Sequence, residues 1–200
     1  MAAGARRIVT ERRMVVVETH WSPVERAYTG RELRSHFAFD EFALVGDSAV
    51  AWLGPCRVDV ADLVDKVDAR AGAFIASPAM VHVIVEHFGV ALVEAVLRQR
   101  LLARLAGDLL REGGAPEVRV RGNDLFAAGR KASVSVATRS PTSALIHFGI
   151  NVRTDGTPLP TYGLAEAGIG AERFARELLG RYAAEIVDIH RAAAKVRAVT

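Results

Sequence analysis

The sequence has few of the features that mark secreted or membrane proteins. It contains one cysteine, Cys56, so no intramolecular disulfide can form. The starting segment MAAGARRIVTERR lacks the apolar core of a signal peptide. The longest charge-free region, residues 71–85, is shorter than the roughly 20 apolar residues that cross a bilayer. We therefore expect a soluble, cytoplasmic protein with no membrane partner.

The surplus of basic charge is small and is spread along the chain. The net charge is +3 and the pI is about 9.4. Nucleic-acid-binding proteins usually concentrate such charge and often set aromatic residues between the basic ones. The nearest approach to a cluster, Arg98, Arg100, Arg104 and Arg111, fits the solvated face of an amphipathic helix. We expect no nucleic-acid partner, whereas anionic small molecules or an acidic carrier domain remain compatible with the charge.

One domain spanning residues 1–200 is expected. A chain of 200 residues, half of them apolar, can bury one substantial core, and no repeat or low-complexity tract divides this one. Apolar patterns predict an alternation of strands and helices, which favours an α+β fold with a mixed or antiparallel sheet and flanking helices. Strands are predicted at residues 13–18, 43–53 (with a turn at 46–47) and 80–88, and helices after Asp59 and at residues 91–112 and 171–196.

Residues 121–152 carry the most informative pattern, because a polar turn there joins two alternating apolar segments. The turn contains Gly129, Arg130 and Lys131, and the glycine allows a ligand to approach closely. A lysine held at the start of a strand can aim a fixed charge at a carboxylate or phosphate, and can polarise an acyl group. The alternative is a solvated hairpin with an ordinary surface lysine.

The same residues resemble a known family. The runs Asn123-Asp124-Leu125, Gly129-Arg130-Lys131 and His147 to Val152 are similar to the central sheet of the biotin and lipoate protein ligases, a class II synthetase-like fold. This resemblance implies that Lys131 contacts the acid or acyl-adenylate. It also implies that Asn123, Asp124, Gly129, Arg130, Gly149 and Asn151 belong to the ligand-binding region.

Over nearly its full length the chain is identified as a member of an uncharacterised archaeal and bacterial family, domain of unknown function 366, which is grouped with those ligases by fold. The segments that carry this closer resemblance are 46–48, 54–56 and 86–88. Because this family has Glu86 and His87 together at the end of a strand, we keep both as ligand-binding candidates. The alternative is that they satisfy neighbouring polar groups.

The resemblance is weaker where the ligases bind nucleotide. Those enzymes wrap the acyl-adenylate phosphate with a glycine-rich loop, whereas residues 68–73 of this chain keep only Arg70 and Gly72. Without several glycines such a loop does not easily expose consecutive amides, so use of ATP is left open and disfavoured. We expect a pocket for a carboxylate-type ligand in which Arg70 and Lys131 converge on the anionic group.

Cys56 and His147 are the further catalytic candidates. Cys56 ends a predicted strand and is a potential thioester-forming nucleophile, although burial as a free thiol is the favoured interpretation. His147 lies on a strand that we expect to pair with the Lys131 strand, and it would bond the ligand or transfer protons. The alternative is a core histidine. Asp124 either caps its turn or orients Lys131 through a charge-assisted bond.

No metal site is predicted. His82, Glu86 and His87 have metal-ligand chemistry, but on a strand His87 faces away from the other two. Two functions therefore remain. One is an acyl ligase or acyltransferase, narrowly favoured, with a small carboxylate or acyl donor and an amine or carrier-protein acceptor supplied in trans. The other is a small-molecule-binding protein on the same scaffold. Homodimerisation through an exposed strand edge is also open.

Overall fold

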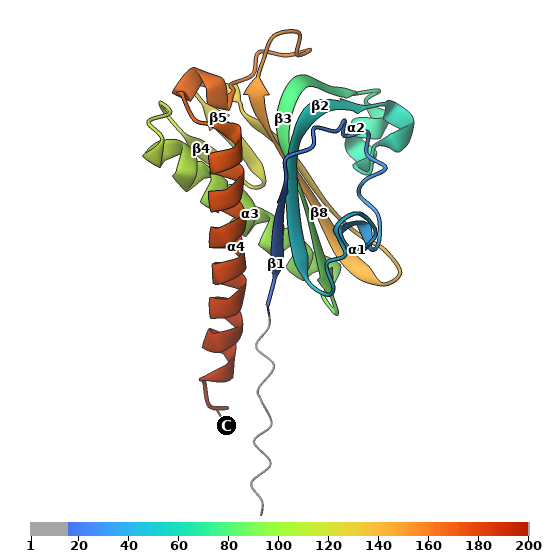
Figure 1. The fold of residues 1–200 in the computed structure, drawn as a ribbon, viewed down its shortest axis with the longest axis vertical. Helices are drawn as coiled ribbons and strands as arrows, with labels where there is room; N and C mark the ends of the chain where they lie inside the picture. The colour runs from blue at the N-terminus through green and yellow to red at the C-terminus, as the bar shows by residue number, and fades with distance from the viewer. Residues whose placement is uncertain (1–15, 200) are drawn as a thin grey trace, which may run out of the picture.

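A mixed five-stranded sheet forms the centre of the molecule, as the sequence predicted. The computed structural model describes residues 16–199. Within the sheet, the strand order is β1-β2-β3-β8-β7 (Figure 1), with β1 parallel to β2 and every other neighbouring pair antiparallel. These strands are β1 (Glu18–Ser22), β2 (Ser48–Val58), β3 (Ile75–Phe88), β7 (Ser133–Arg139) and β8 (Ser143–Arg153).

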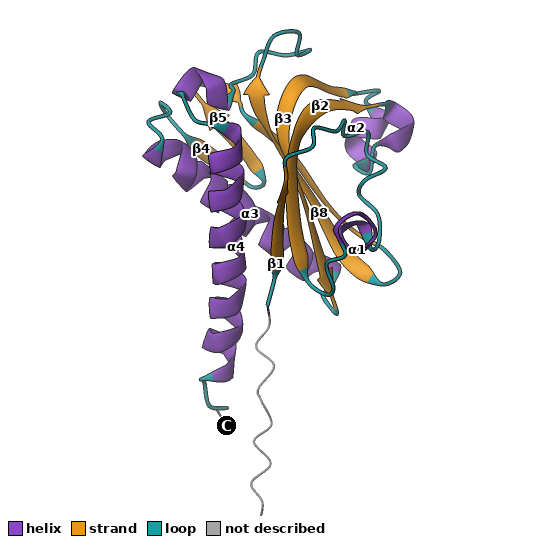
Figure 2. Ribbon diagram, viewed as in Figure 1, coloured by secondary structure: helices purple, strands orange, loops and turns teal. Residues whose placement is uncertain are grey.

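Two long helices cover one face of this sheet (Figure 2). They are α3 (Leu92–Glu112) and α4 (Ala171–Ala194), so both predicted helices are confirmed to within a few residues. Their apolar stripes recur at helical spacing and therefore meet the sheet along one side. Leu102 of α3 and Leu178 and Tyr182 of α4 are fully buried in the same core as Val83 and Phe148 of the sheet.

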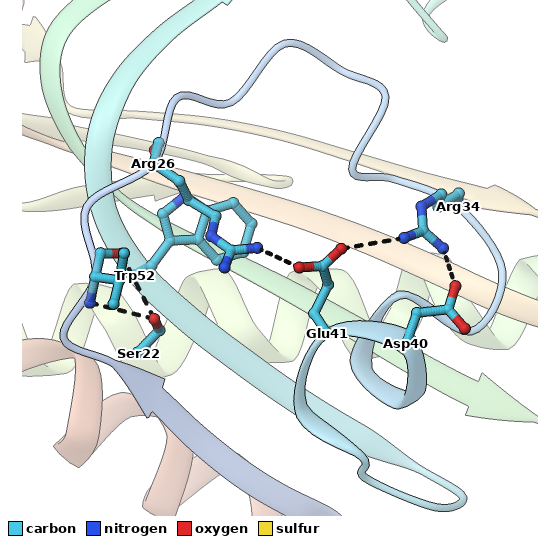
Figure 3. Close-up of polar contacts among 7 residues, drawn as sticks. Ser22, Arg26, Arg34, Asp40, Glu41 and Trp52 are labelled. Carbon is cyan, nitrogen blue, oxygen red and sulfur yellow. Dashed lines mark hydrogen bonds and ion pairs between the residues drawn. The ribbon is translucent and has the colours of Figure 1, made fainter.

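The opposite face is covered by shorter segments. They include α1 (Phe37–Phe42), the 3-10 turn η1 (Val60–Asp62) and α2 (Lys66–Arg70). Trp52 and Met80 from the sheet pack here with Tyr28 and Phe37 from the connection between β1 and β2. Figure 3 shows how that connection is held: Arg26 donates to Glu41 at 2.9 Å, and Arg34 bonds both Glu41 and Asp40.

A second, three-stranded sheet precedes the predicted hairpin in the chain. It contains β4 (Arg119–Arg121), β5 (Asp124–Ala127) and β6 (Arg130–Lys131). The predicted pairing of the strand that follows Lys131 with the His147 strand is confirmed, because β7 pairs with β8 and Val136 lies opposite His147. Lys131 itself lies before β7, in β6, where it is opposite Phe126 of β5. The cause is the turn at residues 128–129, where positive φ angles of 48° and 72° reverse the chain back along β5.

Three local predictions also need correction. The strand predicted at residues 13–18 starts at Glu18, where parallel pairing with β2 begins, and residues 13–15 lie outside the described part. The strand predicted at 43–53 is a single strand that starts at Ser48, after the turn at 46–47. The helix predicted after Asp59 is split into the 3-10 turn η1 and the short helix α2. The residue that caps α2 is Asp65 rather than Asp59, because its side chain accepts from the free amides of the first turn.

The remaining turn of helix is η2 (Leu164–Ala167), which packs against β8 before α4 begins. Among residues 16–199, no helix combines the length and the apolar character needed to span a bilayer.

Candidate functional site

A cavity of about 430 Å³ opens on the sheet face opposite α3 and α4. Met80 of β3, Val134 of β7 and His147 of β8 form part of its lining, together with Tyr28. One wall comes from the chain between β2 and β3, and the opposite wall comes from the small sheet and from residues 157–161. The cavity therefore lies where the two sheets meet, a position that a ligand can enter from one side.

Lys131 and Asp124 form the charged part of the second wall. The Lys131 Nζ atom lies 2.9 Å from Asp124 Oδ1, and both side chains are partly exposed to the cavity. Of the two roles predicted for Asp124, orientation of Lys131 matches this geometry. Nearby, the Asn123 side-chain amide donates to the carbonyl of Ser135 at 2.9 Å. The ammonium group is thus held on a wall whose polar side chains are themselves fixed.

Asn151 continues this polar lining deeper in the cavity. Its amide nitrogen donates to the carbonyl of Ala132 at 3.2 Å, and its carbonyl oxygen accepts from the Ser77 hydroxyl at 2.9 Å. These bonds hold Ala132, the residue after Lys131, against β8.

His147 lines the cavity and belongs to a buried aromatic group. Its ring stacks on Tyr28 with centroids 3.7 Å apart and planes 7° from parallel. Its Nε2 atom lies 3.2 Å from Nδ1 of His82, whose Nε2 in turn lies 3.2 Å from the carbonyl oxygen of Gly54. Burial lowers the pKa of His82 to about 4 and lowers the pKa of His147 well below its usual value, so both rings are neutral near pH 7.

Sequence reasoning missed Tyr28 and considered His82 only as a metal ligand. Tyr28 reaches the site because its backbone forms a parallel bridge with Cys56, 28 residues further along the chain. Such a contact between a loop and a distant strand leaves no periodic signal in the sequence. The alternation along residues 80–88 did place His82 on one face of the strand, and His147 meets it there.

The wall between β2 and β3 is acidic. Asp62, Asp65 and Asp68, here called the acidic wall, all line the cavity. Arg70 and Gly72 are exposed and lie outside the lining, so the structure does not bring Arg70 to Lys131. Along the described lining, Lys131 is the one lysine or arginine.

Three apolar side chains of the cavity lining are exposed. Val64, Phe74 and Leu159 are 40%, 49% and 69% exposed, respectively. Exposed apolar side chains in the lining of a cavity indicate a ligand with an apolar portion.

Cys56 does not line the cavity. Its thiol is buried beneath Tyr28, and burial, followed by the charge of Glu32, raises its pKa to about 12. A thiol with such a pKa is almost entirely protonated at pH 7 and is a poor nucleophile.

Glu86 and His87 also lie away from the cavity. Buried Glu86 accepts from the backbone amide of His36 at 2.8 Å and from the hydroxyl of Ser143 at 2.5 Å. On the other face of β3, His87 is buried between Asp47 and Tyr182. Both residues therefore bond to other segments of the fold rather than to the cavity. Within the part of the chain that is described, no group of three or more His, Cys, Asp or Glu residues is arranged to hold a metal ion.

The other predicted ligand-binding residues support the walls. Arg130 donates to Glu166 at 2.6 Å and to the carbonyl of Thr161 at 2.9 Å, and thereby fixes the 157–161 segment beside the small sheet. Gly129 occupies the tight turn before β6. At Gly149, a Cβ atom would lie 2.8 Å from the terminal methyl group of Met80, so this glycine leaves room for the Met80 side chain.

Comparison with solved structures gives a match over most of the chain and further matches of the fold. A protein of unknown function from Pyrococcus horikoshi is 36% identical, with a TM-score of 0.86 over 92% of this chain and all of that chain. A biotin protein ligase from Aquifex aeolicus in complex with biotin and ATP has a TM-score of 0.55 at 14% identity, covering 86% of this chain and 70% of that one. A putative lipoate protein ligase from T. acidophilum with bound lipoic acid has a TM-score of 0.53 at 14% identity, covering 87% of each chain. At these identities the two ligases establish the fold alone.

Sequence comparison identifies the family. An uncharacterized protein from Methanocaldococcus jannaschii is 33% identical over 82% of this chain and 77% of its own length. The model of the family described as "Domain of unknown function (DUF366)" matches residues 17–197. The chain therefore belongs to the DUF366 family and has the biotin/lipoate protein ligase fold.

Proposed function

We propose that this protein binds a small carboxylate-type or acyl ligand in the cavity and acts on it as an acyl ligase or acyltransferase. The observation that carries the proposal is that a fixed ammonium group, on Lys131, and a neutral imidazole, on His147, line the same cavity. Acyl transfer needs these two elements: a positive charge where the carbonyl oxygen becomes negative, and a group that takes the proton of the nucleophile.

The apolar parts of the cavity suit the rest of such a ligand. Met80 and Val134 lie in its lining, and Val64, Phe74 and Leu159 are exposed side chains of the same lining. An aliphatic chain would lose its contact with water there, while its carboxyl end would lie near Lys131. Solved proteins of this fold have been crystallised with biotin and with lipoic acid, which combine an apolar body with one carboxylate, and this supports the proposed ligand class.

The acidic wall favours an acyl donor that is already activated, such as a thioester whose phosphate groups stay outside the cavity, over formation of an adenylate inside it. A triphosphate in the cavity would face Asp62, Asp65 and Asp68 with Lys131 as its cationic partner. The negative charges of the phosphates and of the three carboxylates repel each other, so ATP would bind weakly unless cations accompanied it.

In the transfer step, an amine supplied in trans by a small molecule or a carrier protein attacks the carbonyl carbon of the thioester. A C–N bond forms, the C–S bond breaks, and the sulfur leaves with the bonding electron pair. The amine proton passes through His147 to the leaving thiolate, and Lys131 stabilises the oxyanion of the tetrahedral intermediate.

A non-catalytic small-molecule-binding protein is the second candidate. Its specific support is the burial of Cys56, which leaves no thiol on the cavity lining to carry an acyl group. Direct transfer to an external amine does not need such a thiol, and for this reason the enzymatic proposal is preferred.

The test is to incubate the protein with octanoyl-CoA, lipoate or biotin, each with and without Mg-ATP, in the presence of a lysine-containing peptide. Native mass spectrometry detects bound ligand, and denaturing mass spectrometry detects the acylated peptide. Lys131→Ala should abolish transfer, while Lys195→Ala, in the exposed region after α4, should behave as the unmodified protein. Binding without transfer would establish the second candidate, and failure to bind any of these compounds would refute both.

A further inference from the structure

A chain of hydrogen bonds runs from the backbone of β2 to His147. It determines which ring nitrogen of each of two buried histidines, His82 and His147, carries a proton. It begins at the carbonyl of Gly54, which can only accept a hydrogen bond, so the facing Nε2 of His82 carries a proton. Because the His82 ring is neutral, its other nitrogen, Nδ1, has a free lone pair. This lone pair faces Nε2 of His147 at 3.2 Å, so that Nε2 must be the donor.

The second ring nitrogen of His147, Nδ1, carries no proton. In a neutral ring whose Nε2 carries the proton, Nδ1 has a lone pair and no hydrogen. No hydrogen-bond partner of this Nδ1 is found among residues 16–199, although His147 is only 3% exposed and lines the cavity. Nδ1 is not among the described side-chain atoms that are both buried and without a partner, so it reaches the cavity surface, where a ligand or water can donate to it.

The orientation of the ring is also fixed. Tyr28 stacks on His147 at a centroid distance of 3.7 Å, and it also stacks on His82 at 5.1 Å. The backbone of His147 pairs with Ile84 on one side and Val136 on the other, within the centre of the sheet. A rotation of the imidazole would therefore break both the stack and the bond to His82.

We infer that His82 is a positioning residue that holds His147 in its Nε2-protonated form, so that Nδ1 accepts a hydrogen bond or a proton from a group in the cavity. The ligand group that meets His147 is then an N–H or O–H donor. The assignment of the tautomer is independent of the proposed function. Its consequence for transfer rests on that function, because it identifies Nδ1 as the atom that receives the amine proton.

Nitrogen-15 NMR of the complete, ligand-free protein tests the tautomer directly. Long-range correlations in histidine-labelled protein distinguish a nitrogen with a proton from one with a lone pair, and His147→Gln assigns the His147 signals by their loss. The expected pattern for His147 is a proton on Nε2 and a lone pair on Nδ1. A proton on Nδ1, or on both nitrogens, at pH 7 would overturn the inference whatever the ligand is.

Two variants separate positioning from structural support. His82→Gln keeps a donor and an acceptor and should preserve the His147 tautomer, whereas His82→Phe removes the acceptor and should give a mixture of both tautomers. If His82→Phe does not fold, the tautomer measured in the unmodified protein still supports or overturns the inference. An unchanged single tautomer in folded His82→Phe would show that His82 does not set it.

A kinetic measurement then tests the consequence for catalysis. With octanoyl-CoA as donor, His82→Phe should lower kcat at least tenfold with little change in KM, and His82→Gln should restore most of the rate. Equal loss in both variants would contradict positioning and indicate structural damage. Absence of transfer in the unmodified protein would refute the proposed function alone, since the tautomer is measured without a ligand.

Discussion

The Nε2 atom of His87 lies 2.7 Å from the hydroxyl of Tyr182, and this contact joins β3 to α4. On its other side, Nδ1 of His87 donates to Asp47 at 2.7 Å. Asp47 also accepts from the amide of Phe88 at 2.9 Å, and despite partial burial these two bonds, together with the charge of Arg98, hold the pKa of the Asp47 carboxyl below the usual range. The network lies on the helical face of the sheet, away from the cavity, and ties β3 and α4 to the turn at residues 46–47.

Tyr182→Phe should destabilise the fold by about 1–3 kcal/mol, because it leaves the buried Nε2 lone pair of His87 without a donor. Urea denaturation followed by circular dichroism measures the change. His190→Ala, on an exposed position of the same helix, serves as the control and should change the unfolding free energy by less than about 0.5 kcal/mol. Equal stability of Tyr182→Phe and the unmodified protein would mean that water replaces the hydroxyl.

Acid should weaken the fold between about pH 6.5 and pH 4. Burial lowers the pKa of His82 from 6.5 to about 4, and the pKa values of His87 and His147 are lowered as well, also chiefly by burial. In this range the unfolded chain binds more protons than the folded chain, so stability is fully present above pH 6.5 and falls as the pH falls. For His82 the loss is on the order of 3 kcal/mol at pH 4.

Urea midpoints measured at several pH values check this dependence. His82→Gln has no titrating group at position 82, so its stability should fall less steeply in the same range. If the stability of His82→Gln falls with pH as steeply as that of the unmodified protein, protonation of His82 does not cause the acid sensitivity.

Cys56 should be unreactive in the folded protein. Its buried thiol, with a pKa raised to about 12, presents neither an accessible sulfur nor a thiolate. Ellman's reagent at pH 8 should label it quickly only after unfolding in guanidinium chloride. Cys56→Ala should keep the ligand binding and any transfer activity of the unmodified protein, whereas loss of transfer with intact binding would reinstate the cysteine as a nucleophile.

Gly54 and Gly180 should respond in opposite directions to alanine. A Cβ atom at Gly54 would lie 1.8 Å from the carbonyl oxygen of Arg26, which also accepts from the Trp52 indole at 3.0 Å. The backbone segments at Gly54 and Arg26 would have to move apart, which should lower the free energy of unfolding by about 3 kcal/mol or more. Gly180 lies inside α4, where an added Cβ atom would have no neighbour within 4 Å, so alanine there should raise the free energy of unfolding by about 0.5–1 kcal/mol. Thermal unfolding of both variants measures the contrast, and a stable Gly54→Ala protein would contradict the close approach.

The sequence predicted the elements whose signal is local. The long helices follow from apolar residues at helical spacing, and the opposite directions of His82 and His87 follow from strand alternation. The site needed contacts that spacing does not encode. Tyr28 is placed by a bridge to a distant strand, and Lys131 belongs to a separate small sheet because of two positive φ angles in the preceding turn. Arg70 was expected beside Lys131, but the cap at Asp65 starts a short helix that leaves Arg70 exposed.

The acidic wall should weaken the binding of anionic ligands, and removing one of its charges should strengthen it. Asp68→Asn keeps the shape of an exposed side chain at the cavity wall, whereas Asp65 is left intact because it caps α2. Repulsion between unit charges several ångströms apart in water is below about 1 kcal/mol, so affinity for a carboxylate ligand should rise about two- to fivefold.

Isothermal titration calorimetry with octanoate or lipoate measures this gain, and lipoamide is the matched neutral ligand whose affinity should not change. Because the interaction is electrostatic and close to solvent, the gain should shrink as salt is raised from 20 mM to about 500 mM, where screening acts over a few ångströms. A similar rise for lipoate and lipoamide would point to a change in shape rather than in charge. Weaker binding of lipoate in Asp68→Asn would mean that Asp68 contacts the ligand directly and would place the carboxylate elsewhere in the cavity.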